Sequence, residues 1–239
     1  MRDSLDRFVA DLVVAEIGRT HNQYSRRDPE LDLPEGPSVR TVNLLTYLRS
    51  HSSPRVLLVG EAPGYRGCRF SGIAFTSERS LPQSSWSSTR TSGWQEASAT
   101  IVQRTLHRLG IELSTLLWNA VPTHPAADTP LSNRTPSKAE LEEGAQWFER
   151  LMTLARPQLV VAVGRSASAV LPAGVPCVRH PANGGAGAFS AQLESVLFEC
   201  GLLSEQVMVS RSSGPRWDSE DEPSESSWQG VLGPALATS

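Results

Sequence analysis

Lysine and cysteine are both scarce in this chain. Lys138 is the only lysine among 239 residues, so nearly all of the positive charge comes from arginine. The three cysteines, Cys68, Cys177 and Cys200, have no close spacing. Such a set argues against a disulfide framework and against a four-cysteine metal site. We interpret them as inert thiols in a reducing compartment.

Long hydrophobic runs are also missing. No apolar segment is long enough to span a bilayer. Residues 1–12 carry acidic side chains and lack the apolar stretch of a secretory signal. We therefore expect a cytoplasmic protein with no membrane contact. Hydrophobic residues make up 39% of the chain, a low value that predicts disorder in part of it.

The chain has no excess of positive charge. Its formal net charge is -3, and residues 211–239 account for all of it, with two arginines and five acidic residues. The neutral remainder does not by itself indicate a nucleic-acid-binding protein. Arg66, Arg69, Arg79 and Arg90 nevertheless lie in or after one loop, where they could contact phosphates. The alternative is that they are scattered, solvated side chains.

Short apolar runs alternate with helix-like segments along the chain. The predicted strands are residues 55–60, 115–121, 159–164 and 176–179. The predicted helices are residues 4–18, 39–50 after Ser38 as N-cap, 94–109, 138–155 after a Ser137–Glu140 capping box, 165–171 and 187–202. Strands that are continuous apolar runs indicate a parallel sheet covered on both faces. The pattern predicts an α/β protein, a three-layer α/β/α sandwich with a central, mainly four-stranded parallel sheet.

The same pattern divides the chain into three parts. Residues 1–52 are expected to form a helical segment packed on the core, and residues 53–209 the catalytic domain. Residues 210–239, rich in Ser, Pro and Glu, are expected to be a disordered acidic tail. Trp217 and Trp228 could make this tail a peptide motif for a partner protein, although an inert tail is the alternative.

Polar or glycine-rich loops follow three of the predicted strands, at residues 60–75, 119–125 and 180–187. In a parallel sheet, the loops at the carboxyl ends of the strands form the binding site. A phosphate site is disfavoured there because GKS, GKT and GxGxxG are absent, Pro63 lacks an amide donor, and Glu61 would repel phosphate. The absence of GxSxG argues against an α/β-hydrolase.

Four short motifs occur in order at these strand ends. They are Gly60-Glu61-Ala62-Pro63-Gly64, Gly72-Ile73-Ala74-Phe75, Asn119 and His180-Pro181-Ala182. Together they resemble the motifs of the uracil-DNA glycosylase superfamily, especially those of its iron–sulfur branch. The resemblance covers roughly residues 53–202. It implies a base-excision repair enzyme that hydrolyses the N-glycosidic bond of uracil, or of other deaminated bases, and leaves an abasic site in DNA.

The resemblance implies a role for each catalytic candidate. His180 would donate a ring N–H to O2 of the leaving base, where negative charge develops. Asn119 would pair with N3–H and O4 of uracil and reject cytosine, which reverses donor and acceptor. Glu61 would position the attacking water and stabilise the positively charged sugar, or alternatively hold its loop. Phe75 would stack on the flipped base, with Phe70 as the alternative.

Further positions follow from the same resemblance. Gly60, Ala62, Pro63 and Gly64 would form the wall of the base pocket. Gly64 stands where the most uracil-selective relatives have a tyrosine, which implies a less strict pocket that accepts 5-substituted bases. The candidates for DNA contact are Arg66, Arg69, Asn183, Gly184 and Gly185.

The chain also departs from the family in two ways. No cysteine precedes Cys68, and three cysteines cannot supply the four thiolate ligands of a cluster, so we expect no iron–sulfur cluster and no other metal. The turn at Asn183-Gly184-Gly185 lacks an apolar wedge to open a duplex, which predicts a preference for uracil in single-stranded DNA. We expect a monomer whose acidic tail could bind a repair partner. The alternative function is a catalytically weak or silent member that binds DNA or a modified nucleotide.

Overall fold

The protein contains a four-stranded, all-parallel sheet in the order β2-β1-β3-β4. The computed structural model describes residues 2–81, 87–91 and 93–203. The strands are β1 (Val56–Gly60), β2 (Thr115–Asn119), β3 (Leu159–Val163) and β4 (Cys177–Val178). Their register places Gly60 beside Asn119, so two of the motif residues end neighbouring strands.

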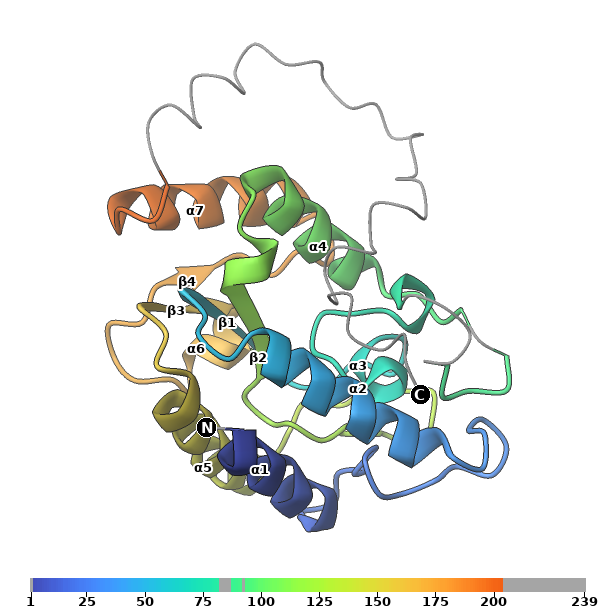
Figure 1. The fold of residues 1–239 in the computed structure, drawn as a ribbon. Coiled ribbons are helices and arrows are strands. Elements are labelled where there is room, and N and C mark those ends of the chain that lie inside the picture. The colour runs from blue at the N-terminus through green and yellow to red at the C-terminus, as the bar shows by residue number, and fades with distance from the viewer. Residues whose placement is uncertain (1, 82–86, 92, 204–239) are drawn as a thin grey trace, which may run out of the picture.

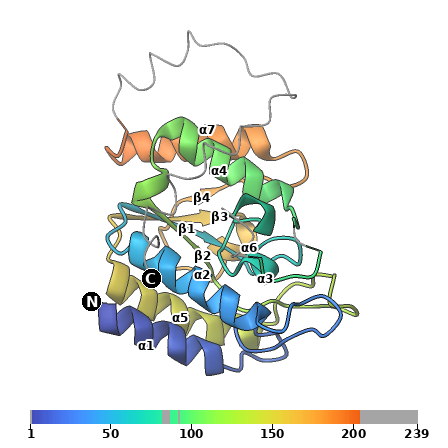
Figure 2. The same cartoon turned by 45° about the vertical axis from the view of Figure 1, so that its right-hand side comes forward.

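Helices cover both faces of this sheet. They are α1 (Arg2–Val14), α2 (Gly36–Ser50), α3 (Cys68–Ser71), α4 (Ala97–Leu109), α5 (Lys138–Ala155), α6 (Arg165–Ser168) and α7 (Ala186–Glu199), with short 3₁₀ turns at Glu78–Ser80 and Glu112–Ser114. Helices α4 and α7 lie on one face, and α1, α2 and α5 lie on the other (Figures 1 and 2). The predicted three-layer sandwich is confirmed.

Helix boundaries test the capping predictions directly. Helix α5 begins after Ser137, whose side chain accepts from the Glu140 amide while the Glu140 carboxylate accepts from the Ser137 amide, as predicted. The prediction of Ser38 as N-cap of α2 was wrong. That helix begins at Gly36, because Pro37 needs no amide partner in the first turn and fits there. Helix α4 begins at Ala97, three residues later than expected.

The N-terminal helix shares the core of the sheet. Leu5, Phe8 and Leu12 of α1 belong to the same buried cluster as the strand residues. The Phe8 ring lies 5.7 Å from the ring of Trp118 in β2 and 5.6 Å from that of Trp147 in α5. Residues 2–50 therefore bury apolar surface against the sheet. The predicted tail, residues 210–239, lies outside the described residues.

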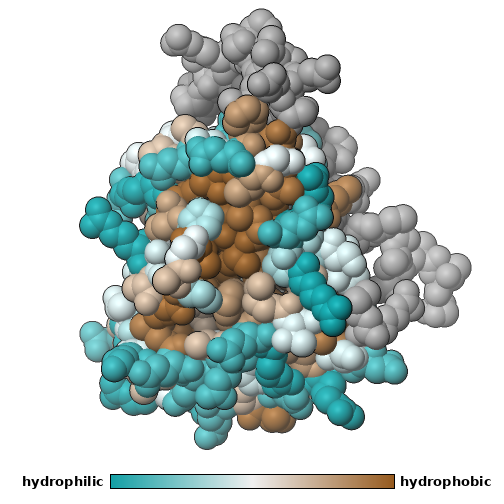
Figure 3. Space-filling model, turned by 90° about the vertical axis from the view of Figure 1, so that its left-hand side faces the viewer, coloured by the Kyte–Doolittle hydropathy of each residue, from teal (hydrophilic) through white to brown (hydrophobic). Residues whose placement is uncertain are grey.

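Figure 3 shows one side of the molecule, where an apolar area is bordered by polar residues above and below. The large apolar side chains that are clearly exposed include Val14, Val42 and Leu113. Among the described residues, no helix combines the length and the apolarity needed to cross a membrane.

Candidate active site

An open cleft of about 1230 Å³ lies at the carboxyl ends of the strands. Parallel strands bring their carboxyl ends to one edge of the sheet, so the loops after β1, β2 and β4 meet there. The lining includes most of the predicted site residues: Glu61, Ala62, Pro63, Gly64, Arg66, Phe75, Asn119, His180 and Asn183. Residues distant in the sequence are thus collected into one cavity.

Gly60 permits the close packing at the floor of this cleft. A Cβ atom at Gly60 would lie 2.6 Å from Cζ of Phe75 and 2.9 Å from Oδ1 of Asn119. Any larger residue would therefore displace both side chains.

Phe75 itself has a φ of 48°, which is rare outside glycine and costs of order 1–3 kcal/mol. Gln103 supports this strained backbone by donating to the Phe75 carbonyl at 3.1 Å.

Phe75 lines the cleft, whereas Phe70 does not. The Phe70 ring is fully buried and stacks on Trp94, with the ring centroids 4.9 Å apart. Phe75 faces His180 instead, at a centroid separation of 6.4 Å and an interplanar angle of 41°. The position of Phe75 at the floor of the cleft is the one that a stacking residue requires.

His180 has a defined tautomer. The amide N–H of Ala182 donates to Nδ1 of His180 at 3.1 Å, so the proton of the neutral ring is on Nε2. Burial lowers the pKa of His180 below its ordinary value, and the positive charge of Arg179 lowers it further. The imidazole is therefore neutral near pH 7 and carries its only N–H donor at Nε2.

The comparisons with known proteins agree with this arrangement. Residues 49–217 match the family model described as the Uracil DNA glycosylase superfamily. The chain belongs to this superfamily. Its fold is similar to the crystal structure of wild-type SMUG2 from Pedobacter heparinus, with a TM-score of 0.58 and 15% sequence identity over 83% of this chain and 98% of that one. No match was found among curated proteins.

Glu61 is a half-buried carboxylate of this uracil-DNA-glycosylase-type cleft. Its backbone carbonyl accepts from the amide of Val121 at 2.9 Å. Within the described part of the chain, its carboxylate has no hydrogen-bond or ion-pair partner. The alternative that the Glu61 side chain holds its own loop therefore has no support, and the carboxylate is free to contact water or substrate.

Glu96, a second acidic residue in the cleft, was missed by the sequence reasoning. It is the N-cap residue of α4, but its side chain makes no capping hydrogen bond. Burial raises the pKa of Glu96, and a hydrogen bond from the Ser98 hydroxyl partly opposes that rise. The predicted helix began at residue 94, whereas α4 begins at Ala97, so Glu96 lies before the helix and at the cleft.

His124 is also absent from the predicted site, although it lies in one of the three predicted loops. Its Nδ1 atom lies 2.8 Å from the carbonyl oxygen of Pro63, to which the neutral ring donates. Burial lowers the pKa of His124 to about 4, so the ring stays neutral at physiological pH. His124 thereby fixes the loop after β1 from the loop after β2.

The predicted DNA contacts divide into two groups. Arg66, Asn183 and Gly184 are exposed at or next to the cleft and are available to a ligand. The prediction for Gly185 was wrong, because this residue is buried and its amide already donates to the Ala182 carbonyl at 3.1 Å. The prediction for Arg69 was also wrong: its side chain is 1% exposed and forms an ion pair with Asp32 at 3.2 Å.

The carboxyl group of Glu96 lies beside Gly64 at the wall of the cleft. A Cβ atom at Gly64 would lie 3.3 Å from the carboxyl carbon and both carboxyl oxygens of Glu96. An acidic group therefore borders this wall of the cleft, and the less strict pocket expected from Gly64 stays a prediction.

The three thiols differ in their burial and none is paired. Cys68 is buried, whereas Cys177 and Cys200 are exposed, and all are free. Within residues 2–81, 87–91 and 93–203, no group of three or more His, Cys, Asp or Glu side chains is placed to hold a metal ion. The described residues therefore do not bring together the four thiolate ligands that an iron–sulfur cluster requires.

Proposed function

We propose that this protein is a monofunctional DNA glycosylase that hydrolyses the bond between uracil and deoxyribose and leaves an abasic site. The observation that carries the proposal is the convergence of Asn119, Phe75 and His180 on one cleft, with the proton of His180 held on Nε2. Superfamily membership supports the general class of reaction. The substrate, uracil in DNA, is inferred from the chemistry of the side chains.

Each side chain has a distinct task in this reaction. The leaving base develops negative charge on O2, and a positioned Nε2–H of His180 stabilises it. A neutral donor suffices, because its dipole is already oriented by the Ala182 amide. The sugar becomes positively charged as the bond breaks, and the unpaired Glu61 carboxylate stabilises it and orients the attacking water.

Asn119 determines which base is accepted. Its side chain is 5% exposed, fills space that the missing side chain of Gly60 leaves, and shares a hydrogen bond with the buried Cys68 thiol. The carboxamide offers one acceptor and two donors, which complement N3–H and O4 of uracil. Cytosine presents the opposite pair, and each polar group left unpaired in such a site costs about 1–3 kcal/mol.

We expect the purified protein to convert uracil in oligonucleotides into abasic sites that alkali then cleaves. The exposed Asn183-Gly184 turn carries no apolar wedge, so single-stranded substrate should react faster than matched duplex, where the base must first be unpaired. Labelled strands with one uracil, single-stranded or paired with guanine or adenine, measure both points. Folded protein that binds these strands without forming abasic sites would support the silent-binder alternative instead.

The pH dependence should report on His180. Because its pKa is lowered, the neutral ring persists below pH 6.5, and the activity should fall only as the pH drops through this lowered pKa. Replacement of Arg179 by Ala removes the positive charge that helps to lower the pKa of His180. The pKa of His180 should therefore rise, and the acidic limb of the pH–rate profile should move to higher pH. Arg165→Ala, at another exposed arginine of the cleft, is the matched control and should leave the limb in place. An unmoved limb in the Arg179 variant would contradict this assignment.

We also propose that the enzyme works as a cytoplasmic monomer without a cluster or metal. The argument for the missing cluster is the cysteine count, since three thiolates cannot replace four. Optical spectra and metal analysis of freshly purified protein test this directly. A brown protein with cluster absorbance would overturn it.

A further inference from the structure

A groove opens beside the cleft, along the first turns of α4. This α4 groove has a volume of about 530 Å³, and its lining includes Tyr65, Arg66, Gln95, Arg104 and Asn133. Tyr65, Arg66 and Asn133 also line the cleft, so the groove and the cleft are continuous. Sites for small ligands have volumes of about 300–1,000 Å³, and the α4 groove is therefore large enough to hold one nucleotide.

The α4 groove is bordered by positive charge that forms no ion pair. Arg66 and Arg104 are both exposed, and within the described part of the chain neither guanidinium group has a carboxylate partner. By contrast, Arg108, one turn further along α4, forms an ion pair with Glu194 of α7 at 2.6 Å. Two unpaired guanidinium groups beside one groove attract an anion, and their planar sets of donors suit a phosphate group.

The acidic member of the groove lining, Glu96, is directed at the loop after β1. A Cβ atom at Gly67 would overlap Oε2 of Glu96, so the carboxyl group occupies the space that this glycine leaves. The hydroxyl of Ser98 donates a hydrogen bond to the same carboxyl group. Glu96 forms no ion pair with Arg66 or Arg104, and both guanidinium groups therefore stay available to a ligand in the groove.

Tyr65 lies where the α4 groove meets the cleft. Its backbone amide donates to Oδ1 of Asn133 at 3.0 Å, which connects the loop after β1 with the loop after β2. The guanidinium carbon of Arg66 lies 5.2 Å from the centroid of the Tyr65 ring, and Tyr65 is half-buried. An aromatic ring held beside unpaired arginines is the combination that binds single-stranded nucleic acid, because the ring stacks on a base while the arginines contact the backbone.

A base that enters the cleft stays attached to its strand, so the next nucleotide must lie immediately outside the cleft. We propose that the α4 groove binds this neighbouring nucleotide on one side of the uracil, with its phosphate between Arg66 and Arg104 and its base on the ring of Tyr65. This inference rests on the proposed function and names the part of the DNA strand that the enzyme holds beside the excised base.

The first test measures the salt dependence of DNA binding. The probe is a fluorescent single-stranded oligonucleotide with a stable abasic-site analogue in place of the uracil nucleotide, titrated at several salt concentrations. Arg104→Ala should reduce the slope of log Kd against log salt concentration by about 0.7, the value for one phosphate contact to a single strand. Arg104→Lys keeps the charge and should restore most of the slope. Arg108→Ala removes the same charge from a paired arginine of α4 and should leave the slope unchanged.

The second test measures kcat/KM on three single-stranded substrates, in which the uracil lies in the middle, at the 5′ end or at the 3′ end. On the first substrate, Tyr65→Ala should lower kcat/KM about 10-fold, whereas Tyr65→Phe keeps the ring and should react as the wild type does. One of the two end-positioned substrates lacks the nucleotide that the α4 groove holds. On that substrate alone, Tyr65→Ala and the wild type should have the same kcat/KM.

The two tests keep the outcomes separate. An unchanged salt slope in Arg104→Ala, or an equal loss on all three substrates in Tyr65→Ala, overturns the role of the α4 groove and leaves the proposed function standing. A wild-type protein that forms no abasic sites, but whose binding depends on Arg104 and not on Arg108, overturns the proposed function and supports the groove as a site for single-stranded DNA.

Discussion

Replacing His180 with alanine should lower the single-turnover rate of uracil excision by about 10²–10³-fold. The loss is this large because the Nε2–H of His180 is aimed at the atom on which charge develops in the transition state. Water that enters the vacated space is not oriented by the Ala182 amide, as the imidazole is. The measurement uses saturating enzyme over a labelled uracil oligonucleotide, so that the rate reports the chemical step and not binding.

His107→Ala is the matched control for this variant. The side chain of His107 is 67% exposed on α4, and its Nδ1 lies 3.2 Å from Glu112. The same substitution there should leave the excision rate within a factor of two or three, because an exposed pair of this kind contributes at most about 1 kcal/mol. If His180→Ala retains more than a third of the wild-type rate, His180 is not the donor to the leaving base.

The fold was predictable because its strands are buried on both faces. Residues 56–60 and 115–119 are buried throughout, so each reads as a continuous apolar run rather than an alternating one. Strand ends were less accurate: β4 pairs only through Cys177 and Val178, although the prediction extended it to residues 176–179. A strand ends where its hydrogen-bonded pairing with the neighbouring strand stops, and the sequence of one strand does not contain that information.

The candidate site was predictable where its residues directly follow strands. Asn119 and the loop after β1 meet because parallel pairing brings Gly60 beside Asn119. Glu96 could not be found in this way, because it enters the cleft from the long loop before α4 and its carboxyl occupies space that Gly64 and Gly67 leave free. Its backbone is fixed by a residue nineteen positions earlier, Ser77.

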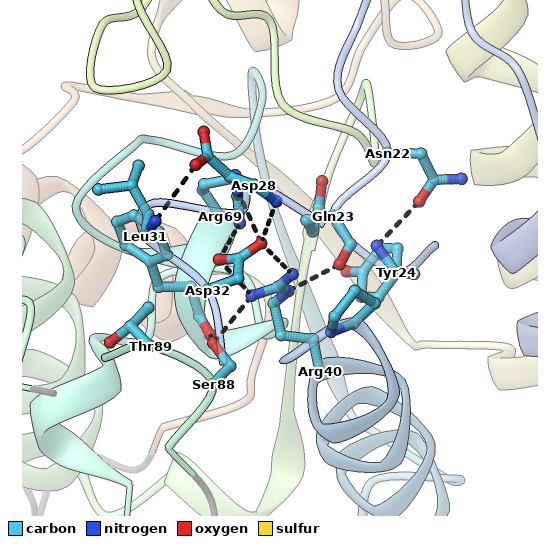
Figure 4. Close-up of polar contacts among 12 residues, drawn as sticks. Asn22, Gln23, Tyr24, Asp28, Leu31, Asp32, Arg40, Arg69, Ser88 and Thr89 are labelled. Carbon is cyan, nitrogen blue, oxygen red and sulfur yellow. Dashed lines mark hydrogen bonds and ion pairs between the residues drawn. The ribbon is translucent and has the colours of Figure 1, made fainter. Parts of the chain in front are cut away.

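The error at Arg69 has the same origin. An arginine in a glycine-rich loop suggests exposure, but Asp32, which is 37 residues earlier, holds it inside the protein. Asp32 also pairs with Arg40 through two hydrogen bonds of 3.1 Å and 3.0 Å (Figure 4). Arg40 donates further to Ser88 Oγ at 3.0 Å and to the Gln23 carbonyl at 2.7 Å. One buried carboxylate thus joins the residue 20–37 loop, α2 and α3.

Asp32→Ala is therefore expected to be the most destabilising single substitution considered, with a loss of about 3–5 kcal/mol in the free energy of unfolding. The side chains of Asp32 and Arg40 are fully buried and that of Arg69 nearly so, and the variant leaves both guanidinium groups without their carboxylate. The free energy of unfolding of a stable domain is only about 5–15 kcal/mol in total, so this variant should be close to unfolding. Urea denaturation followed by circular dichroism measures the change.

Asp6→Ala supplies the comparison, since Asp6 pairs with Arg49 at 2.7 Å but both side chains are more than 40% exposed. The loss in the free energy of unfolding in Asp6→Ala should be at most about 1 kcal/mol.

The dependence of stability on pH gives a second check on Asp32. Burial alone would raise the pKa of Asp32, but the hydrogen bond and charge of Arg40, with the charge of Arg69, hold it below its ordinary value. This stabilisation is therefore complete above the ordinary pKa of Asp and is lost as the pH falls through the lowered value.

Equal destabilisation by Asp32→Ala and Asp6→Ala would show that the buried ions do not stabilise α3. With α3 released, the loop that ends at Phe75 would lose its anchor, so excision should fail in Asp32→Ala at urea concentrations that leave the wild type active.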